Sequence, residues 1–242
     1  MKDVSTWYSP RIEQDLHLVR WGHWGTPVLL FPTAGGDAEE CERFLMIQAL
    51  GPLLEAGRIK IYSLDSVAGR AWTRNDSPEY CTRLQNAFDE AIYREVVPAI
   101  RTDCKSTEIR VITAGASIGA FNAVASLCRH PDVFRAAIGM SGTYDLSKWL
   151  RGTRPEGFHF TSPIHFLPLL DEGEQLHLLR RRYVLLATGE GRWEEPASTW
   201  HMAETLGSKG IPNRVDSWGP AWDHDWPTWR AMLPKYLDEL TA

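Results

Sequence analysis

The sequence predicts a single α/β domain in which helices cover both faces of a mostly parallel sheet. Short apolar runs alternate with longer segments that have helical spacing along most of the chain. The length of 242 residues fits one large domain of this kind better than two small ones. Between one β-branched run and one Ala-rich run lies a corner of small residues at 115–119. Such a corner is typical of a strand that turns sharply into a helix.

The expected strands are apolar or alternating runs, and the first of them alternates enough to be an edge strand. They lie at 15–21, 27–31, 59–63, 111–113, 135–140, 183–188 and 214–218. The expected helices lie at 40–54, 84–100, 120–127, 199–209 and 228–240. Because strands and helices alternate, most strands should be parallel, and candidate ligand sites should lie just beyond the carboxyl ends of the strands.

Two segments have no clear period. Residues 65–78 are expected to be irregular, and they contain Trp72. Residues 145–180 combine several prolines and aromatics, and they are expected to form a small irregular insertion on the substrate side. With no repeat or linker between elements, one domain should span residues 1–242.

Composition excludes several classes of function. A net charge of −5 argues against nucleic acid as the main partner. The chain has no apolar run of membrane-spanning length, and its N-terminus lacks the apolar core of a signal peptide. The four cysteines are irregularly spaced, which favours reduced thiols. We therefore expect a cytoplasmic protein with no cofactor and no membrane partner, and its oligomeric state stays open.

The corner at 115–119 reads Gly-Ala-Ser-Ile-Gly, a Gly-x-Ser-x-Gly pattern between a strand and a helix. Gly115 and Gly119 leave room where a Cβ would collide, and Ser117 is forced into a strained conformation at the helix N-terminus. There the helix dipole favours developing negative charge. With 19 glycines in the chain the bare pattern could arise by accident, but the strand and helix around it favour a nucleophile.

A serine hydroxyl needs a base and an oriented third group. Among eight histidines, His224 is the candidate base, because it lies in a Trp-Asp-His-Asp-Trp segment between the last strand and the last helix. The loop after strand 183–188 offers Glu190, Glu194 and Glu195 as the acid. A metal at the Asp-His-Asp cluster is disfavoured because no spaced set of further ligands accompanies it.

The oxyanion of an acyl-transfer reaction needs two N–H donors. One is the backbone of Ile118, directly after the serine, and the other should come from Thr33 or Ala34 in the small-residue loop after strand 27–31. Thr33 is the preferred donor, and Ala34 is expected to contact substrate. Four tryptophans lie on or near the predicted site loops, where they would either stack on a substrate or pack the loops: Trp72, Trp149, Trp193 and Trp222. Of these, Trp72, Trp193 and Trp222 are the expected substrate contacts.

Four segments together resemble the Putative esterase family of α/β-hydrolases: 31–36, 115–119, 140–145 and the His-x-Trp-x-x-Trp tail at 224–229. That family includes S-formylglutathione hydrolases, feruloyl and acetyl-xylan esterases, and the mycolyltransferases of the antigen 85 group. The resemblance covers nearly the whole chain. It implies an α/β-hydrolase fold, Ser117 as nucleophile and His224 as base. It also implies an acid on the 190–195 loop, with Thr33 and Ile118 as oxyanion donors.

Among the three glutamates, Glu194 is preferred as the acid. Glu190 follows Gly189 in the turn that ends the strand, and Glu195 is restricted by Pro196. Glu194 follows Trp193, whose ring could shield the carboxylate, and related esterases carry an acidic residue after an aromatic on this loop. The resulting hypothesis is a serine carboxylic-ester hydrolase that acts on a small-molecule ester through an acyl-enzyme. The alternatives are an acyltransferase of the same fold and a non-catalytic binding protein.

Overall fold

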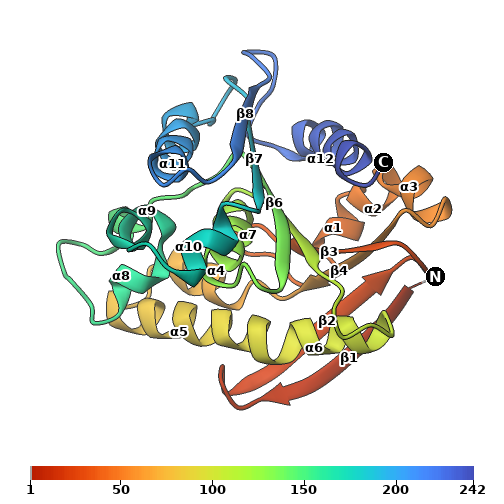
Figure 1. The fold of residues 1–242 in the computed structure, drawn as a ribbon, viewed down its shortest axis with the longest axis horizontal. Coiled ribbons are helices and arrows are strands. Elements are labelled where there is room, and N and C mark those ends of the chain that lie inside the picture. Colours follow the sequence, from red (N-terminus) through yellow and green to blue (C-terminus); the bar gives the residue numbers. More distant parts are fainter. Residues whose placement is uncertain (1) are drawn as a thin grey trace.

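A computed structural model describes residues 2–242 as one eight-stranded sheet flanked by helices (Figure 1). The strand order is β1-β2-β4-β3-β5-β6-β7-β8. Their bounds are β1 Lys2–Ser9, β2 Gln14–Trp21, β3 Thr26–Phe31, β4 Ile59–Leu64, β5 Val111–Ala116, β6 Phe134–Met140, β7 Tyr183–Thr188 and β8 Asn213–Ser217. The strands from β4 to β8 in that order pair in parallel, whereas β1 and β2 are antiparallel. The predicted α/β class with a mostly parallel sheet is confirmed.

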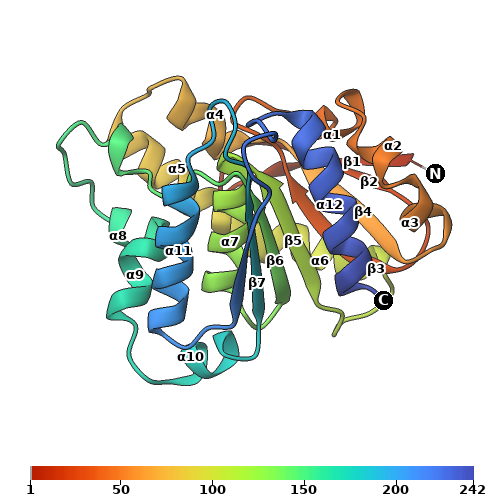
Figure 2. The same cartoon turned by 90° about the horizontal axis from the view of Figure 1, so that it is seen from above.

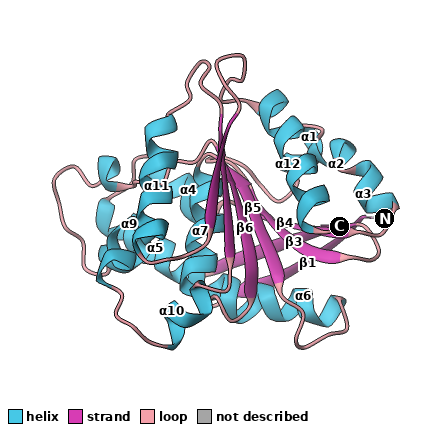
Figure 3. Cartoon of the chain, turned by 45° about the horizontal axis from the view of Figure 1, so that its top comes forward, coloured by secondary structure: helices cyan, strands magenta, loops and turns pink. Residues whose placement is uncertain are grey.

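Helices form a layer on each face of the sheet (Figures 2 and 3). One layer packs its apolar side chains on the strand residues Val28, Leu30 and Ile112. It comprises α1 (Glu40–Arg43), α2 (Met46–Ala49), α3 (Gly51–Glu55) and α12 (Trp226–Leu240). The other layer packs on Leu29 and Phe31, which alternate with them along β3. Its members include α5 (Pro78–Ala91), α6 (Val97–Asp103), α7 (Ile118–Arg129), α10 (Glu174–Leu179) and α11 (Pro196–Ser208). Burial on both faces explains why these strands read as continuous apolar runs.

The strand predicted at 15–21 is present as β2, but the prediction that it forms the sheet edge is wrong. β1 pairs with it antiparallel along its whole length, from Lys2 opposite Trp21 to Ser9 opposite Gln14. β1 is mostly exposed and polar. A polar edge strand of this kind protects a sheet from pairing with other chains, and it lacks the apolar signal by which strands are recognised.

The helices differ from the predicted ones where the backbone turns. The predicted helix 40–54 is divided into α1, α2 and α3, because Leu45 adopts a left-handed φ of 63° between the first two. Residues 65–78 were expected to be irregular, but they contain helix α4 (Val67–Thr73). The predicted helix 84–100 begins earlier, at Pro78, and passes through a π-helical turn, η1 (Ile92–Val96), before α6. Pro98, which cannot donate a backbone hydrogen bond, lies just beyond that turn.

The segment at 145–180 consists of short helical pieces that pack beside α5, α7 and α11. These are η2 (Ser147–Trp149), α8 (Phe158–Thr161), α9 (Pro163–Phe166), η3 (Leu167–Leu169) and α10. All four cysteines are free thiols, and Cys41, Cys81 and Cys128 are buried.

Candidate functional site

Ser117 lies at the corner between β5 and α7, with φ 58° and ψ −123°. A Cβ on Gly115 would lie 2.3 Å from the carbonyl of Gly119, and a Cβ on Gly119 would lie 2.5 Å from the carbonyl oxygen of Pro32. Both positions therefore require glycine. The close packing holds Ser117 in a conformation that L residues rarely adopt, and such strain is a feature of functional corners.

Backbone hydrogen bonds fix the corner to the next strand. The Ser117 N–H donates to the Met140 carbonyl at 3.0 Å, and the Ser117 carbonyl accepts from the Thr143 N–H at 3.2 Å. The N–H groups of the first turn of a helix have no partner four residues earlier. The Ile118 N–H at the start of α7 is thus well placed to bind an anion beside the serine. Within residues 2–242, no hydrogen bond joins the Ser117 hydroxyl to His224.

Glu194 and His224 are brought together by two loops at the carboxyl end of the sheet. The Glu194 side chain is only 1% exposed, and its Oε2 lies 3.9 Å from His224 Nδ1. This separation is that of an ion pair and exceeds a hydrogen bond. Burial raises the pKa of the Glu194 carboxyl, but the neighbouring His224 imidazole and the Ser141 hydroxyl lower it by more, so its pKa lies below the ordinary value. Glu194 is therefore held as a buried carboxylate.

The two loops are joined by backbone contacts. The His224 N–H donates to the Arg192 carbonyl at 3.0 Å, and the Arg192 N–H donates to the Asp223 carboxylate at 2.7 Å. Trp193 adopts a left-handed φ of 64° within this turn. A Cβ on Gly189 would lie 2.0 Å from the Trp222 carbonyl oxygen, so this close approach of the loops also needs a glycine.

The other acidic candidates are engaged elsewhere. Glu190 is exposed and accepts a hydrogen bond from the Ser217 hydroxyl at 2.5 Å. Glu195 is exposed at the N-terminus of α11. Asp223 binds Arg192, and Asp225 accepts from the Trp226 N–H at the start of α12. Among the carboxylates on these loops, Glu194 alone is buried and paired with His224 within residues 2–242.

Three further residues, Ser141, Thr188 and Trp229, surround the Glu194–His224 pair. The Ser141 hydroxyl donates to Glu194 Oε1 at 2.5 Å and accepts from Trp229 Nε1–H at 3.0 Å. The Thr188 hydroxyl contacts the other carboxylate oxygen at 3.2 Å. The Trp229 ring lies edge-on to the His224 ring, with centroids 5.2 Å apart. Ser141 and Trp229 lie in two of the segments that resemble the family, 140–145 and 224–229, whereas no sequence pattern indicated a role for Thr188.

The loop after β3 departs from the expectation for Thr33. Its N–H donates to the Glu40 carboxyl at 2.7 Å, and its hydroxyl donates to the same group at 2.6 Å. The Thr33 N–H is therefore not free to stabilise an oxyanion in this conformation. Ala34 packs against the apolar cluster that contains Ile118, and its N–H has no partner in the part of the chain that the structure describes. Of the two candidate donors on this loop, Ala34 is therefore the one whose N–H is not hydrogen-bonded within residues 2–242.

The three tryptophans that were expected to contact substrate differ in their exposure to solvent. Trp72 is 0% exposed and donates to Gln85, because α4 turns its ring into the core beneath α7. The prediction that Trp72 contacts substrate is corrected, since a fully buried ring cannot stack on a ligand. Trp193 is 73% exposed, with the Arg192 guanidinium 4.7 Å from its ring centre. Trp222 is half-buried and lies edge-on to Trp218.

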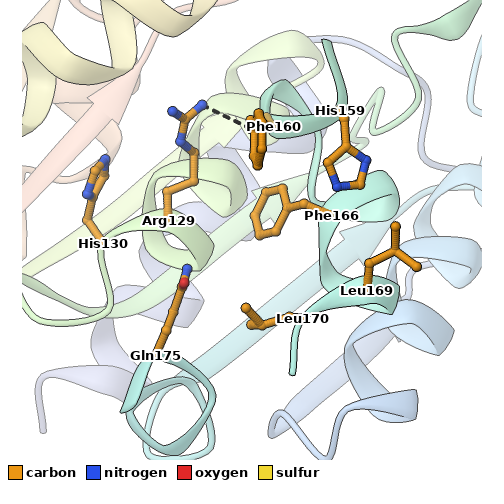
Figure 4. A pocket seen from close by; sticks show the side chains of 8 residues that line it. All are labelled: Arg129, His130, His159, Phe160, Phe166, Leu169, Leu170 and Gln175. Carbon is orange, nitrogen blue, oxygen red and sulfur yellow. Dashed lines mark hydrogen bonds between the residues drawn. The ribbon is translucent and has the colours of Figure 1, made fainter. Parts of the chain in front are cut away.

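A cavity of about 380 Å³ lies away from these residues (Figure 4). It is lined by Arg129 and His130 at the C-terminal end of α7 and by residues of the 145–180 segment, including Phe160 and Phe166. Ser117 precedes the other end of this 12-residue helix, which rises about 18 Å. The cavity is thus separate from the candidate site.

This chain is similar to known proteins both in sequence and in fold. A family model described as Putative esterase matches residues 57–240, a range that includes Ser117, Glu194 and His224. No curated protein sequence matches the chain. Within residues 2–242, no helix combines the length and apolar character needed to cross a membrane.

Several solved structures are similar over the whole chain at low identity. A ferulic acid esterase has a TM-score of 0.76 at 17% identity, with 100% of this chain and 97% of that chain covered. The S-formylglutathione hydrolase FrmB of Staphylococcus aureus has a TM-score of 0.64 at 13% identity, with 100% and 96% covered. MPT51 of Mycobacterium tuberculosis has a TM-score of 0.64 at 16% identity, with 100% and 98% covered. These likenesses show the α/β-hydrolase fold. Since the family model matches well over half of the chain, the protein belongs to the Putative esterase family.

Proposed function

We propose that this protein is a serine carboxylic-ester hydrolase that acts on small-molecule esters through an acyl-enzyme. The observation that carries the proposal is the pairing of two features at one sheet edge. The strained Ser117 corner follows β5, and the buried Glu194, beside His224, follows the parallel strand β7. Parallel strands present their carboxyl ends at the same edge, where ligands bind in open α/β sheets. Family membership supports the same reaction class.

In the proposed acylation step, the Ser117 hydroxyl attacks the ester carbonyl while His224 Nε2 takes the hydroxyl proton. Glu194 lies on the Nδ1 side of the imidazole, so its negative charge stabilises the imidazolium and orients the ring. The carbonyl oxygen becomes an oxyanion that accepts hydrogen bonds from the Ile118 and Ala34 N–H groups. When the C–O bond breaks, His224 returns the proton to the leaving alcohol.

Deacylation repeats the same steps with water. His224 removes a proton from the water, the hydroxide adds to the acyl carbon, and a second oxyanion forms. Collapse of this intermediate releases the carboxylic acid and returns the proton to Ser117. Catalysis through the imidazole requires its neutral form, because only that form can accept the proton of the serine or of the water.

The test is hydrolysis of p-nitrophenyl esters of increasing acyl length, together with labelling by a fluorophosphonate. Wild-type protein should turn over at least one ester and be labelled at one site. Ser117→Ala should lose both properties, since alanine has no hydroxyl to attack the ester or to react with the fluorophosphonate. Labelling that persists in Ser117→Ala would overturn the assignment of the nucleophile.

The same assay separates the alternatives. A binding protein of this fold would show no Ser117-dependent turnover with any ester. An acyltransferase would release the alcohol slowly in water but faster when an alcohol acceptor is added, with transfer product in place of free acid. A hydrolase gives free acid at a rate that added acceptor does not raise.

A further inference from the structure

The buried carboxyl of Glu40 is a titratable group that the proposed reaction does not use. Glu40 is the first residue of α1 and is only 6% exposed. Both of its oxygens are engaged by a single residue. Oε2 accepts from the Thr33 N–H at 2.7 Å, and Oε1 accepts from the Thr33 hydroxyl at 2.6 Å. A buried carboxyl that accepts two bonds from one residue fixes the orientation of that residue.

The loop at 33–36 wraps closely over this carboxyl. A Cβ on Gly36 would lie 2.4 Å from the Glu40 carboxyl carbon, so only glycine allows this approach. The Gly36 N–H donates to the Thr33 carbonyl at 3.2 Å, which closes a turn, and the Gly36 carbonyl accepts from the Ser66 N–H at 3.1 Å. Glu40 therefore anchors the start of the turn, and Ser66 anchors its end.

This anchoring determines which N–H groups of the loop are already hydrogen-bonded. Glu40 holds the Thr33 N–H, and the Ala34 N–H is left without an acceptor across residues 2–242. Ala34 itself packs against the cluster of Ile118 and Phe121 at the start of α7. The carbonyl oxygen of Ala34 and the side chain of Ile118, the first residue of α7, both lie within 3.4 Å of the Cβ position of Gly69, so Ala34 and Ile118 are close neighbours.

We propose that Glu40 is a positioning residue for oxyanion stabilisation. Its carboxyl binds the N–H and hydroxyl of Thr33, so that Ala34, and not Thr33, supplies the second N–H donor to the oxyanion. This inference rests on the proposed esterase function. It predicts that Glu40 acts on the transition state through loop geometry and contributes little to binding of the ground-state ester.

The main test variant is Glu40→Met, which keeps the length of the side chain but removes both acceptors. Loss of a whole oxyanion donor costs about 100-fold or more in kcat, and a displaced donor should cost part of that, about tenfold or more. KM for a p-nitrophenyl ester should change by less than about threefold, because ground-state contacts stay. The matched control is Glu39→Met, which removes a neighbouring carboxylate that is 45% exposed and pairs with Lys2; its kcat should stay at the wild-type value.

Two further variants separate positioning from general destabilisation. Glu40→Gln can still accept from the Thr33 N–H through Oε1 and can donate through its amide to the Thr33 hydroxyl, so it should recover most of the kcat lost in Glu40→Met. Thr33→Val keeps the N–H bond and removes the hydroxyl bond, and it should show an intermediate loss. Both remain informative if Glu40→Met does not fold.

A boronic acid that forms a tetrahedral adduct at Ser117 gives the readout that a merely structural role would not move. Its inhibition constant should rise in Glu40→Met by about the same factor by which kcat/KM falls. Wild-type kcat in folded Glu40→Met, an unchanged inhibition constant, or a Glu40→Gln variant as impaired as Glu40→Met would each overturn the inference.

Amide hydrogen exchange at residues 33–36 separates failure of this inference from failure of the proposed function. The Thr33 amide should exchange faster in Glu40→Met than in Glu39→Met. Equal exchange would overturn the role of Glu40 whatever the activity. Absence of Ser117-dependent turnover in the wild-type protein would overturn the esterase proposal, and with it the catalytic part of this inference.

Discussion

At the scale of single residues, burial distinguishes Glu194 from the other acids on its loop. Its carboxyl is enclosed and receives hydrogen bonds from Ser141 and Thr188, whereas Glu190 and Glu195 lie in solvent. An enclosed carboxylate interacts more strongly with an imidazolium than an exposed one, because less water screens the pair. Burial of its carboxyl is therefore a physical reason to prefer Glu194 as the acid, and this burial could not be seen in the sequence.

The first prediction compares three variants: Glu190→Gln, Glu194→Gln and Glu195→Gln. Glu194→Gln should show the largest loss of kcat on one activated ester, by about 100-fold or more, because the imidazolium loses its buried counter-charge and its orientation. Glu190→Gln and Glu195→Gln serve as the matched controls and should stay within about threefold of wild type. A larger loss in either control than in Glu194→Gln would show that the acid is assigned to the wrong residue.

At the scale of elements, the corner between β5 and α7 shows how the chain places a reactive group at a cost in stability. Ser117 carries a side chain at φ 58° and ψ −123°, where the absence of a Cβ is favoured. Gly115 and Gly119 must be glycine, since backbone atoms already lie where their Cβ atoms would be. Of the corner residues, Ser117 is the one that carries a side chain in a left-handed conformation. The strain is therefore concentrated on the one residue whose side chain the reaction needs.

This concentration of strain predicts a stability difference between two inactive variants. Ser117→Gly should have a higher free energy of unfolding than Ser117→Ala by about 1 kcal/mol, because relief of strain exceeds the entropy that glycine adds to the unfolded chain. Urea denaturation provides the measurement. The matched control is Ser126, inside α7, where the order should reverse and the glycine variant should be the less stable one. An alanine variant at 117 as stable as the glycine variant would contradict the idea of a strained corner.

At the scale of the whole molecule, the sequence predicted what depends on apolar periodicity and missed what depends on polar contacts over long distances. The parallel strands were predictable because both of their faces are buried. β1 was missed because its residues are mostly polar, and it is held as a strand by its antiparallel pairing with β2. Trp72 was misplaced because only the packing of α4 shows where its ring points.

In the candidate site, too, local sequence features were predicted and long-range polar contacts were missed. The Gly-x-Ser-x-Gly corner carries its own local signal, and its position between β5 and α7 is confirmed. The engagement of Thr33 by Glu40 joins two residues seven positions apart through side-chain atoms, and no local pattern indicates which N–H a carboxylate will bind. Ser141 likewise meets Glu194, and Trp229 meets Ser141, only after β6, β7 and α12 have packed.

The two buried carboxyls should give the folded protein opposite responses to pH. The pKa of Glu194 is lowered in the folded state, so its contribution to stability is present above the unfolded value, about 4.3, and is lost as pH falls through the folded pKa. Burial raises the pKa of Glu40 by more than its bonds to Thr33 lower it. Its contribution is therefore present below the unfolded pKa and is lost as pH rises through the folded one.

Urea unfolding of wild type, Glu194→Gln and Glu40→Gln at about pH 7 and about pH 4 tests these signs, since glutamine is neutral at both. Relative to wild type, Glu194→Gln should be less stable at neutral pH, and the deficit should shrink towards acid pH as the wild-type carboxylate becomes protonated. Glu40→Gln should gain stability over wild type as pH rises, because the wild type alone must ionise a buried carboxyl or retain its proton. A pH-independent difference for either variant would mean that its carboxyl has the same pKa in the folded and unfolded chains. A change of the same sign for both variants would mean that burial affects the two carboxyls alike. Their contacts predict otherwise: Glu194 lies beside an imidazole, whereas the hydrogen-bond donors to Glu40 within residues 2–242 are the amide and hydroxyl of Thr33.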